Sequence, residues 1–339
     1  ETQGLMRSFE DWLPSAVTIA IAGICKNAGK TSLVNHILDL YPEFNWAVFS
    51  TGIDGEETDT VFKTPKPRVK LPGGSLFVCD TRILNLHKGD IAVIIKLPNA
   101  GRPLWIARAL TALETEITGP ASQKAQTDLI FKLKRLGAQK VIVDGSLDRK
   151  AIAHSPLVEA MILAVGASFG SMNEILDELQ RIQLLSRIQL FKTTLNLKTP
   201  GSGDQETILI KTGKSWIDTA LPTVIGNEAS LKKLLSEDAR RLMIPGALSS
   251  RSYKLLKSCL AKLDLGIIVQ HPDRLKLELK ELQELLALTP VRSRQSFCVK
   301  GLALNSWAAG AKPQDADVFR NEIRKRFPDW ESIDIMEYA

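Results

Sequence analysis

The feature of this sequence that most limits its fold is a series of short, continuous runs of Val, Ile, Leu and Ala. In the first half of the chain these runs lie at 16–23, 46–52, 75–81, 90–98, 114–119 and 140–145. Such runs are typical of strands buried on both faces of a parallel sheet. Helical patterns at 30–40, 102–113 and 123–136 lie between several of them, which predicts βαβ units. We therefore expect an α/β fold with a mostly parallel sheet.

The second half of the chain repeats this alternation after a polar break. Residues 171–195 have the pattern of one long helix, and "KTPGSGDQE" (198–206) is the best candidate for a linker. Further strand candidates are "TILIKTG", "PTVIG", "RLMIPGA", "GIIVQHP", "FCVKGLALN" and "SIDIM". With 339 residues the chain is long for one domain and comfortable for two. We expect one α/β domain over 1–197 and a second, smaller α/β domain of uncertain role over 207–339.

The stretch "IAIAGICKNAGKTSLVNHIL" (19–38) joins an apolar run, a small polar loop and a helical pattern. This order is typical of a P-loop, in which backbone N–H groups and a helix N-terminus bind phosphate oxygens. Five residues separate Gly23 from Gly29, one more than the usual pattern has. The alternative is a tight turn between strand and helix. We expect the first domain to resemble those of P-loop NTPases.

Each residue of this loop has an expected role toward ATP and Mg²⁺. Lys30 would neutralise phosphate charge as a catalytic group, and the Thr31 hydroxyl would bind Mg²⁺. The second metal ligand is expected at the end of another buried strand, with Asp144 in "KVIVDGS" preferred to Asp80 in "LFVCDT". Either acid could instead cap the helix that follows it. The expected nucleotide-binding residues are Gly23, Lys26, Asn27, Ala28, Gly29, Lys30, Thr31 and Ser32.

The long charged stretch at 50–74 suggests a switch beside the nucleotide. We expect Asp54 to lie near the metal as a second catalytic group, with Lys66 or Arg68 near the γ-phosphate. The 52–68 loop would then be ordered by the γ-phosphate. A solvated surface loop is the alternative. The small-residue loops 117–123 and 164–172 could also line the site, because ligands in open α/β sheets bind at the carboxyl ends of strands. His36 and His154 are expected to be structural.

Composition and charge exclude several other classes of protein. The net charge is +6, and the lysines and arginines are spread along the chain with acidic residues among them. The aromatic residues are few and do not alternate with the basic ones. Both observations disfavour nucleic acid as a partner. The sequence contains no apolar run long enough to span a membrane and no apparent signal peptide. Four cysteines without CxxC spacing indicate a reducing, cytoplasmic location without a metal cluster. The guanine-reading [NT]KxD pattern is missing, the nearest match being "AKLD" (261–264) in a helical pattern, so ATP is favoured over GTP.

Several motifs together resemble the P-loop subunit of lysine 5,6-aminomutase reactivase. They are "GICKNAGKTS", "STGIDGEETDTVFKTPKPRV", "ITGP", "VIVDGSLDR", "PGALSS" and "LALNSWAAGAKPQDADVF" with "SIDIM". The resemblance covers most of the chain and implies that Gly29, Lys30 and Thr31 hold nucleotide. It departs after the strand ending at Asn305, where Ser306 stands in place of the expected proline. The P-loop variant is also similar to that of dethiobiotin synthetase and, more distantly, of ParA-like ATPases, with Cys25 in place of their signature lysine.

This resemblance implies a function and partners. Its members act with a second ATPase subunit to rescue an adenosylcobalamin-dependent aminomutase. We therefore expect an ATP·Mg²⁺-binding protein that hydrolyses ATP slowly, by positioning and electrostatics. The alternatives are an ATP-dependent ligase or kinase of dethiobiotin synthetase type, and a binding protein whose loop holds another anion without turnover.

Overall fold

The computed structural model of the chain describes residues 9–51, 68–98, 102–146, 157–192, 206–213, 215–307 and 315–337. The chain forms two compact units. Unit 1 comprises Glu1–Ile175 together with Cys298–Ala339, and unit 2 comprises Leu176–Phe297. This division differs from the expected one, because the last part of the expected second domain, 298–339, belongs to unit 1.

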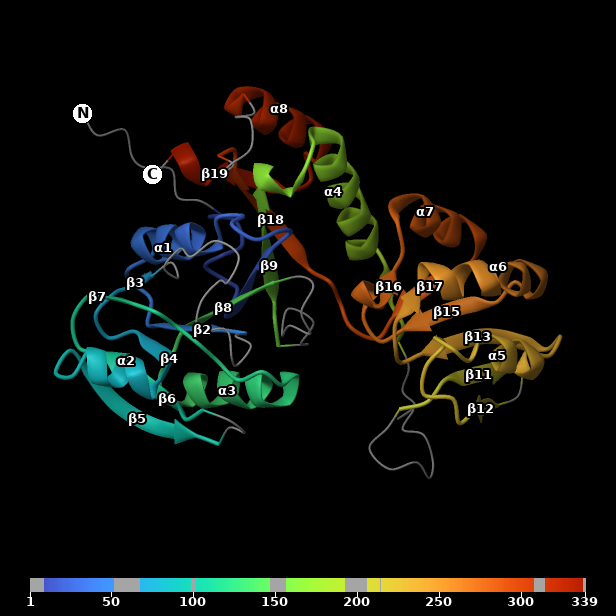
Figure 1. Cartoon of the computed structure of the whole chain (residues 1–339), viewed down its shortest axis with the longest axis horizontal. Coiled ribbons are helices and arrows are strands. Elements are labelled where there is room, and N and C mark those ends of the chain that lie inside the picture. Colours follow the sequence, from blue (N-terminus) through green and yellow to red (C-terminus); the bar gives the residue numbers. More distant parts are fainter. Residues whose placement is uncertain are drawn as a thin grey trace. The chain divides into compact units, whose positions relative to one another are not determined.

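Unit 1 is built on a nine-stranded sheet with the order β19-β18-β9-β1-β8-β2-β4-β6-β5 (Figure 1). All neighbours from β19 to β4 are parallel, whereas β6 is antiparallel to both β4 and β5. The fold is therefore mixed α/β with a large, mostly parallel sheet, as the apolar runs predict. Its strands are β1 (Thr18–Gly23), β2 (Trp46–Ser50), β4 (Leu76–Asp80), β5 (Ile91–Leu97), β6 (Leu104–Ala109), β8 (Lys140–Ser146), β9 (Ala160–Gly166), β18 (Val299–Asn305) and β19 (Glu331–Asp334).

Helices α1 and α3 lie on opposite sides of the centre of this sheet (Figure 1). Helix α1 ends before Tyr41, which precedes a proline and so disfavours helical backbone. The Ser122 hydroxyl accepts a hydrogen bond from Ala125 N and caps α3. The helices and small elements of unit 1 are α1 (Lys30–Leu40), α2 (Thr81–Leu86), α3 (Gln123–Arg135), the first turn of α4 (Met172–Ser186), α8 (Ala316–Arg326), the two-stranded antiparallel sheet of β3 (Val69–Leu71) and β7 (Leu113–Thr115), and the 3-10 turns η2 (Ala167–Phe169) and η4 (Ile335–Glu337).

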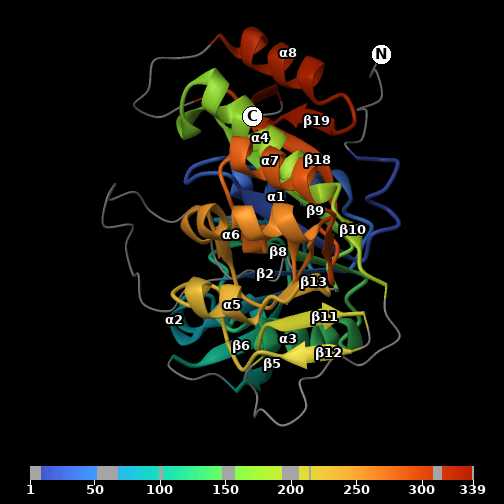
Figure 2. The ribbon, with the colours of Figure 1, turned by 90° about the vertical axis from the view of Figure 1, so that its right-hand side faces the viewer.

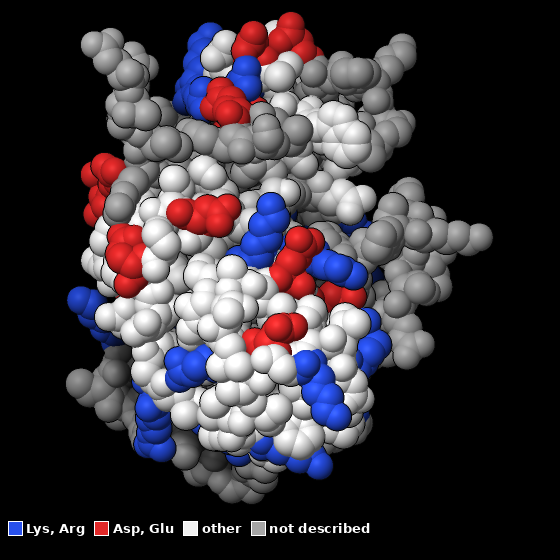
Figure 3. Space-filling model, turned by 90° about the vertical axis from the view of Figure 1, so that its left-hand side faces the viewer, with Lys and Arg blue, Asp and Glu red and all other residues white. Residues whose placement is uncertain are grey.

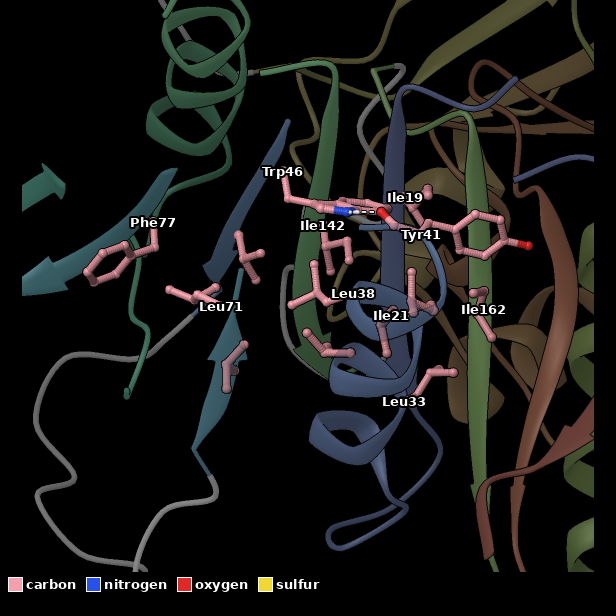
Figure 4. Close-up of a cluster of buried hydrophobic side chains, with 14 of the residues drawn as sticks. Ile19, Ile21, Leu33, Leu38, Tyr41, Trp46, Leu71, Phe77, Ile142 and Ile162 are labelled. Atoms are coloured by element: carbon pink, nitrogen blue, oxygen red, sulfur yellow. Dashed lines mark hydrogen bonds between the residues drawn. The ribbon is translucent and has the colours of Figure 1, made fainter. Parts of the chain in front are cut away.

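One core cluster fills the space between α1 and the sheet (Figure 4). Leu33 and Leu38 of α1 meet Ile19 and Ile21 of β1 there, all fully buried. Within this cluster the indole N–H of Trp46 is buried and donates to the backbone O of Tyr41 at 2.8 Å. Because the apolar side chains of α1 pack on β1, the loop between them is fixed at both ends.

The C-terminal segment completes unit 1. Strand β18 pairs with β9 so that Asn305 lies beside Gly166. The ring of Phe9 packs on β18 where the chain has Gly301, and a Cβ there would lie 2.6 Å from Phe9 Cε1. The backbone N–H of Phe9 also donates to Glu331 Oε1 at 2.7 Å. The two ends of the described chain therefore contact one another within one unit.

Unit 2 has its own six-stranded sheet with the order β10-β17-β15-β13-β11-β12 (Figure 2). The four strands from β10 to β13 are parallel, and β11 and β12 extend the sheet antiparallel. Its elements are β10 (Gln189–Leu190), β11 (Leu209–Thr212), β12 (Trp216–Asp218), α5 (Glu228–Leu234), β13 (Ala239–Ile244), β14 (Leu248–Ser249), α6 (Ser250–Leu263), β15 (Gly266–Val269), η3 (Pro272–Arg274), β16 (Leu275–Lys276), α7 (Leu279–Leu288) and β17 (Val291–Ser293). The second α/β unit expected from the sequence is present in this form.

Several expected elements are wrong. The helix expected over 102–113 is instead β6, which is a strand because it pairs with β4 on one side and β5 on the other. Its side chains alternate only in part between buried and half-buried positions. The loop expected over 164–172 begins inside β9, which is buried along its whole length. The strand expected at 114–119 is only the short β7, and "PTVIG" forms turns before α5. The long helix ends at Ser186 rather than near 195.

The helices in the described part of the chain are all too short or too polar to cross a membrane. This agrees with the absence of a long apolar run from the sequence.

Candidate functional site

The candidate site is the loop Ile24–Gly29, called the glycine loop below, which joins β1 to α1. Strand β1 lies in the middle of the sheet between β8 and β9. Gly29 caps α1 with a φ of 91°, and a Cβ there would lie 2.2 Å from Ile335 Cδ1, so only glycine fits. Neither a side-chain cap nor an acidic residue lies in the first turn of α1. The unpaired N–H groups of this turn therefore suit an anion.

The glycine loop is held from one side by the ends of β9 and β18. The N–H of Ile24 donates to Ala164 O at 3.1 Å. The Ser168 hydroxyl donates to Lys26 O at 3.4 Å, and the Asn305 amide donates to Asn27 O at 3.3 Å. The carbonyl oxygens of Lys26 and Asn27, which would repel an anion, are thus hydrogen-bonded to residues that follow or end the neighbouring strands.

Close packing beneath the loop explains the glycine at 166. A Cβ on Gly166 would lie 2.9 Å from the Cα of Ala28, which is too close for the present backbone. Together with the tether from Asn305, this contact defines the position of the loop between two strand ends. The loop is therefore a preformed element rather than a free turn.

The side chain of Lys30 folds back from α1 over the beginning of the loop. A Cβ on Gly23 would lie 3.1 Å from Lys30 Nζ and 3.2 Å from its Cδ. Gly23 therefore leaves the space that the lysine occupies. This places the ammonium group beside the end of β1.

Asp144 lies near the end of β8, level with Ile21 of β1. Its Oδ1 is buried and accepts no hydrogen bond from the residues that the structure describes. Burial raises the pKa of this carboxyl to about 6, and the positive charge of Lys30 partly offsets the rise. A buried carboxylate oxygen without a donor is costly, so this position favours a nearby cation.

The residues present fit Mg²⁺. Asp144 offers a buried oxygen that receives no hydrogen bond from the described part of the chain, and Thr31 offers a hydroxyl in the first turn of α1. No group of three or more His, Cys, Asp or Glu that could hold a metal occurs among the described residues. Mg²⁺ is usually bound through only one or two carboxylates with phosphates and waters, so such a group is not required.

Asp80 has other partners. Its Oδ1 accepts from Ile83 N at 3.0 Å and caps α2, and its Oδ2 accepts from Arg102 Nη1 at 3.3 Å. Arg102 also donates to the Thr118 hydroxyl at 2.8 Å. Both oxygens of Asp80 are thus engaged, which supports the preference for Asp144 and the capping alternative for Asp80.

The remaining expected residues fall into three groups. Asp54 and Lys66 lie outside the described residues, as does His154, so the proposed switch has no structural description. Arg68 is described and exposed, and its backbone O accepts from Asn35 Nδ2 at 3.2 Å. Burial lowers the pKa of His36, and Asp39 opposes that shift.

Both small-residue segments reach the ends of strands, although the second begins within β9. Thr118 donates its N–H to Val78 O and accepts from Ser50 N, so this loop bridges the ends of β4 and β2. Thr51 N in turn donates to Asp144 O at 2.8 Å. Ser168 follows β9 and contacts the glycine loop.

Sequence reasoning missed Asn305 as a site residue. The signal was present, because Asn305 ends the apolar run "LALN" and a polar residue at the end of a parallel strand lies at the ligand-binding edge. That this edge belongs to the first sheet could not be read from the spacing. Asn305 and Asn27 are separated by 278 positions.

Comparison with known proteins adds little to this geometry. No protein-family model and no curated protein matches the chain. One solved structure with similarity is described as "Crystal structure of the chimerical protein CapA2B2", with 13% identity and a TM-score of 0.25. The match covers 47% of this chain and 66% of that one. At this TM-score the likeness carries no argument about fold or function.

Proposed function

We propose that this protein binds ATP·Mg²⁺ at the glycine loop and hydrolyses the nucleotide slowly. The proposal depends on one observation above all. A glycine loop between a central buried strand and the uncapped N-terminus of α1 brings Lys30 close to the half-buried Asp144, whose Oδ1 is buried. An anion with its own divalent cation would satisfy all three features at once.

The roles of the chain's residues follow from their positions. The N–H groups of the first turn of α1 would bind phosphate oxygens, and Lys30 would neutralise their charge. Thr31 and Asp144 would hold Mg²⁺, which offsets charge on the phosphates when bound. Asn305 and Ser168 would keep the loop in its binding conformation through Asn27 and Lys26.

The biological role that we favour is that of a reactivase subunit for an adenosylcobalamin-dependent aminomutase, acting with a second ATPase subunit. It rests on the motif resemblance alone. The four free cysteines are consistent with the cytoplasmic location that we propose for this role. The second candidate is an ATP-dependent ligase or kinase. Arg102 and Thr118 lie beside the carboxyl end of β4, where they would receive a substrate.

Nucleotide binding is tested by thermal unfolding with and without ATP·Mg²⁺. A ligand at ~100 times its dissociation constant adds about 2.7 kcal/mol to the free energy of unfolding. We expect the Tm of the wild type to rise by a few degrees and that of Lys30→Ala to stay nearly unchanged. Lys300→Ala is the matched control. Lys300 is exposed near the beginning of β18, at the amino ends of the parallel strands, whereas the glycine loop lies at their carboxyl ends. An unmoved wild-type Tm at saturating ATP·Mg²⁺ would refute the proposal.

A second measurement separates the two candidate roles. The ATPase rate is followed with a panel of small carboxylic acids and amines, and separately with an adenosylcobalamin-dependent aminomutase. An ATPase rate that rises with the aminomutase, and not with any of the small molecules, favours the reactivase role. Turnover that requires a small molecule favours the ligase or kinase.

A further inference from the structure

Two exposed aromatic side chains follow neighbouring strand ends beside the glycine loop. Trp307 comes soon after the end of β18 and is 63% exposed, and Phe169 comes soon after the end of β9 and is 36% exposed. The two strands pair so that Asn305 lies beside Gly166. Tryptophan is highly buried on average, so an indole this exposed at the carboxyl ends of parallel strands suits contact with a ligand better than packing in the core.

Two hydrogen bonds connect the backbone of Trp307 to the glycine loop. The N–H of Trp307 donates to Asn305 Oδ1 at 3.2 Å, and Asn305 Nδ2 donates to Asn27 O at 3.3 Å. Asn305 Nδ2 also lies 3.3 Å from the position that a Cβ on Gly29 would occupy, directly before α1. The single side chain of Asn305 therefore spans the distance between Trp307 and the loop that would bind phosphate.

The two ends of a bound nucleotide would lie on opposite sides of β1. The order of the strands here is β18-β9-β1-β8. Asp144 belongs to β8, and the positive charge of Lys30 acts on its carboxyl, so the terminal phosphates and Mg²⁺ would lie on the β8 side. The nucleoside end of the same molecule would then extend toward β9 and β18, where Trp307 lies.

Charge alone would not distinguish a nucleotide from another polyphosphate. The N–H groups of α1 and the ammonium group of Lys30 would bind phosphate oxygens whatever group the phosphates carry. On the face of the molecule shown in Figure 3, charges of both signs are separated by uncharged side chains, and neither sign covers a continuous area. An aromatic ring, in contrast, recognises a nucleobase, because every base has a π-face on which the ring stacks.

We propose that the indole of Trp307 stacks on the base of the nucleotide that the glycine loop holds. The site then prefers a nucleoside triphosphate to an inorganic polyphosphate, which separates it from a loop that holds any anion. Phe169, after the neighbouring strand end, borders the same side of the loop. This inference rests on the proposed nucleotide site and adds the contact that recognises the base.

Isothermal titration of the full chain with ATP·Mg²⁺, and separately with inorganic triphosphate and Mg²⁺, tests this contact. We expect the wild type to bind ATP more tightly than triphosphate. Trp307→Ala should weaken ATP binding about tenfold and leave triphosphate binding unchanged. Trp307→Phe keeps an aromatic ring and should keep most of the ATP affinity. Phe131→Ala is the control, since it removes a ring that is 50% exposed on α3, and it should change neither affinity.

The outcomes separate the base contact from the nucleotide site itself. If the wild type binds neither ligand, the proposed ATP site is wrong and the base contact is wrong with it. If Trp307→Ala loses affinity for both ligands alike, Trp307 acts on the loop through Asn305 and not on the base, which overturns the inference. Unchanged ATP affinity in Trp307→Ala overturns it too, while the proposed function stands. Far-UV circular dichroism shows whether each variant is folded.

Discussion

Asp144 shows how the environment of one residue links structure to proposed function. Its carboxyl is enclosed at the end of a central strand, and burial raises its pKa from 3.8 to about 6. Between these values the folded protein binds more protons than the unfolded chain, so the free energy of unfolding falls as the pH rises through this range. A shift of about two units corresponds to roughly 3 kcal/mol, lost once the pH exceeds the folded pKa.

This sign gives a prediction for Asp144→Asn in the absence of nucleotide. Asparagine has nearly the same shape and no charge to bury, so the variant should be more stable than the wild type at about pH 8 and similar to it at about pH 4. Thermal melts at both pH values measure the difference. With ATP·Mg²⁺ at the higher pH, the advantage should shrink, because only the wild type gains a metal ligand.

Asp80→Asn is the matched control for this prediction. Asparagine also caps helices well, so α2 keeps its cap while the ion pair with Arg102 is lost. This variant should not gain stability between the two pH values. A gain equal to that of Asp144→Asn would show that the burial of Asp144 is not the cause.

At the scale of elements, the ends of β9 and β18 form the support for the glycine loop. The amide of Asn305 crosses from β18 to Asn27, and its Oδ1 accepts from Trp307 N at 3.2 Å. We expect Asn305→Ala to weaken ATP·Mg²⁺ binding by about fivefold, since one net hydrogen bond contributes about 1 kcal/mol. Isothermal titration measures the affinity. Asn227→Ala removes a similar side-chain bond, to Thr223 O in unit 2, and should leave affinity unchanged. Equal affinity in all three proteins would mean that the loop needs no tether.

The elements show which features a sequence can predict. Strand β1, the loop and α1 were predicted closely, because apolar runs, glycines and helical spacing are local signals. Strand β6 was mistaken for a helix, because "LWIARA" mixes apolar and polar residues without strict alternation and owes its strand to pairing on both sides. The positions of Lys30 at the start of α1 and of Asp144 near the end of β8 could be predicted from local signals. The contact of Asn305 with the glycine loop could not, because it depends on the pairing of distant strands.

On the scale of the whole molecule, unit 1 is made from two separate parts of the chain. Strand β18 pairs with β9 although the whole of unit 2 lies between them in the sequence, and β19 extends the sheet beyond β18. The expected boundaries at 197 and 207 followed a polar break, which marks a loop but not the return of the chain to its first sheet. No local signal distinguishes "FCVKGLALN" as a strand of one sheet or the other.

This discontinuity predicts how fragments of the chain behave. A fragment of residues 1–197 lacks β18, β19 and α8, so β9, buried along its length in the intact protein, becomes an edge. We expect this fragment to aggregate or to melt without a cooperative transition. Residues 1–175 joined to 298–339 by a Gly/Ser linker of about 12 residues, with an r.m.s. span of about 20 Å, should restore cooperative unfolding. Circular dichroism melts and near-UV spectra of both variants, compared with the full chain, decide the question. Cooperative unfolding of 1–197 alone, with a native near-UV spectrum, would show that the C-terminal strands are an addition to unit 1 and not part of its core.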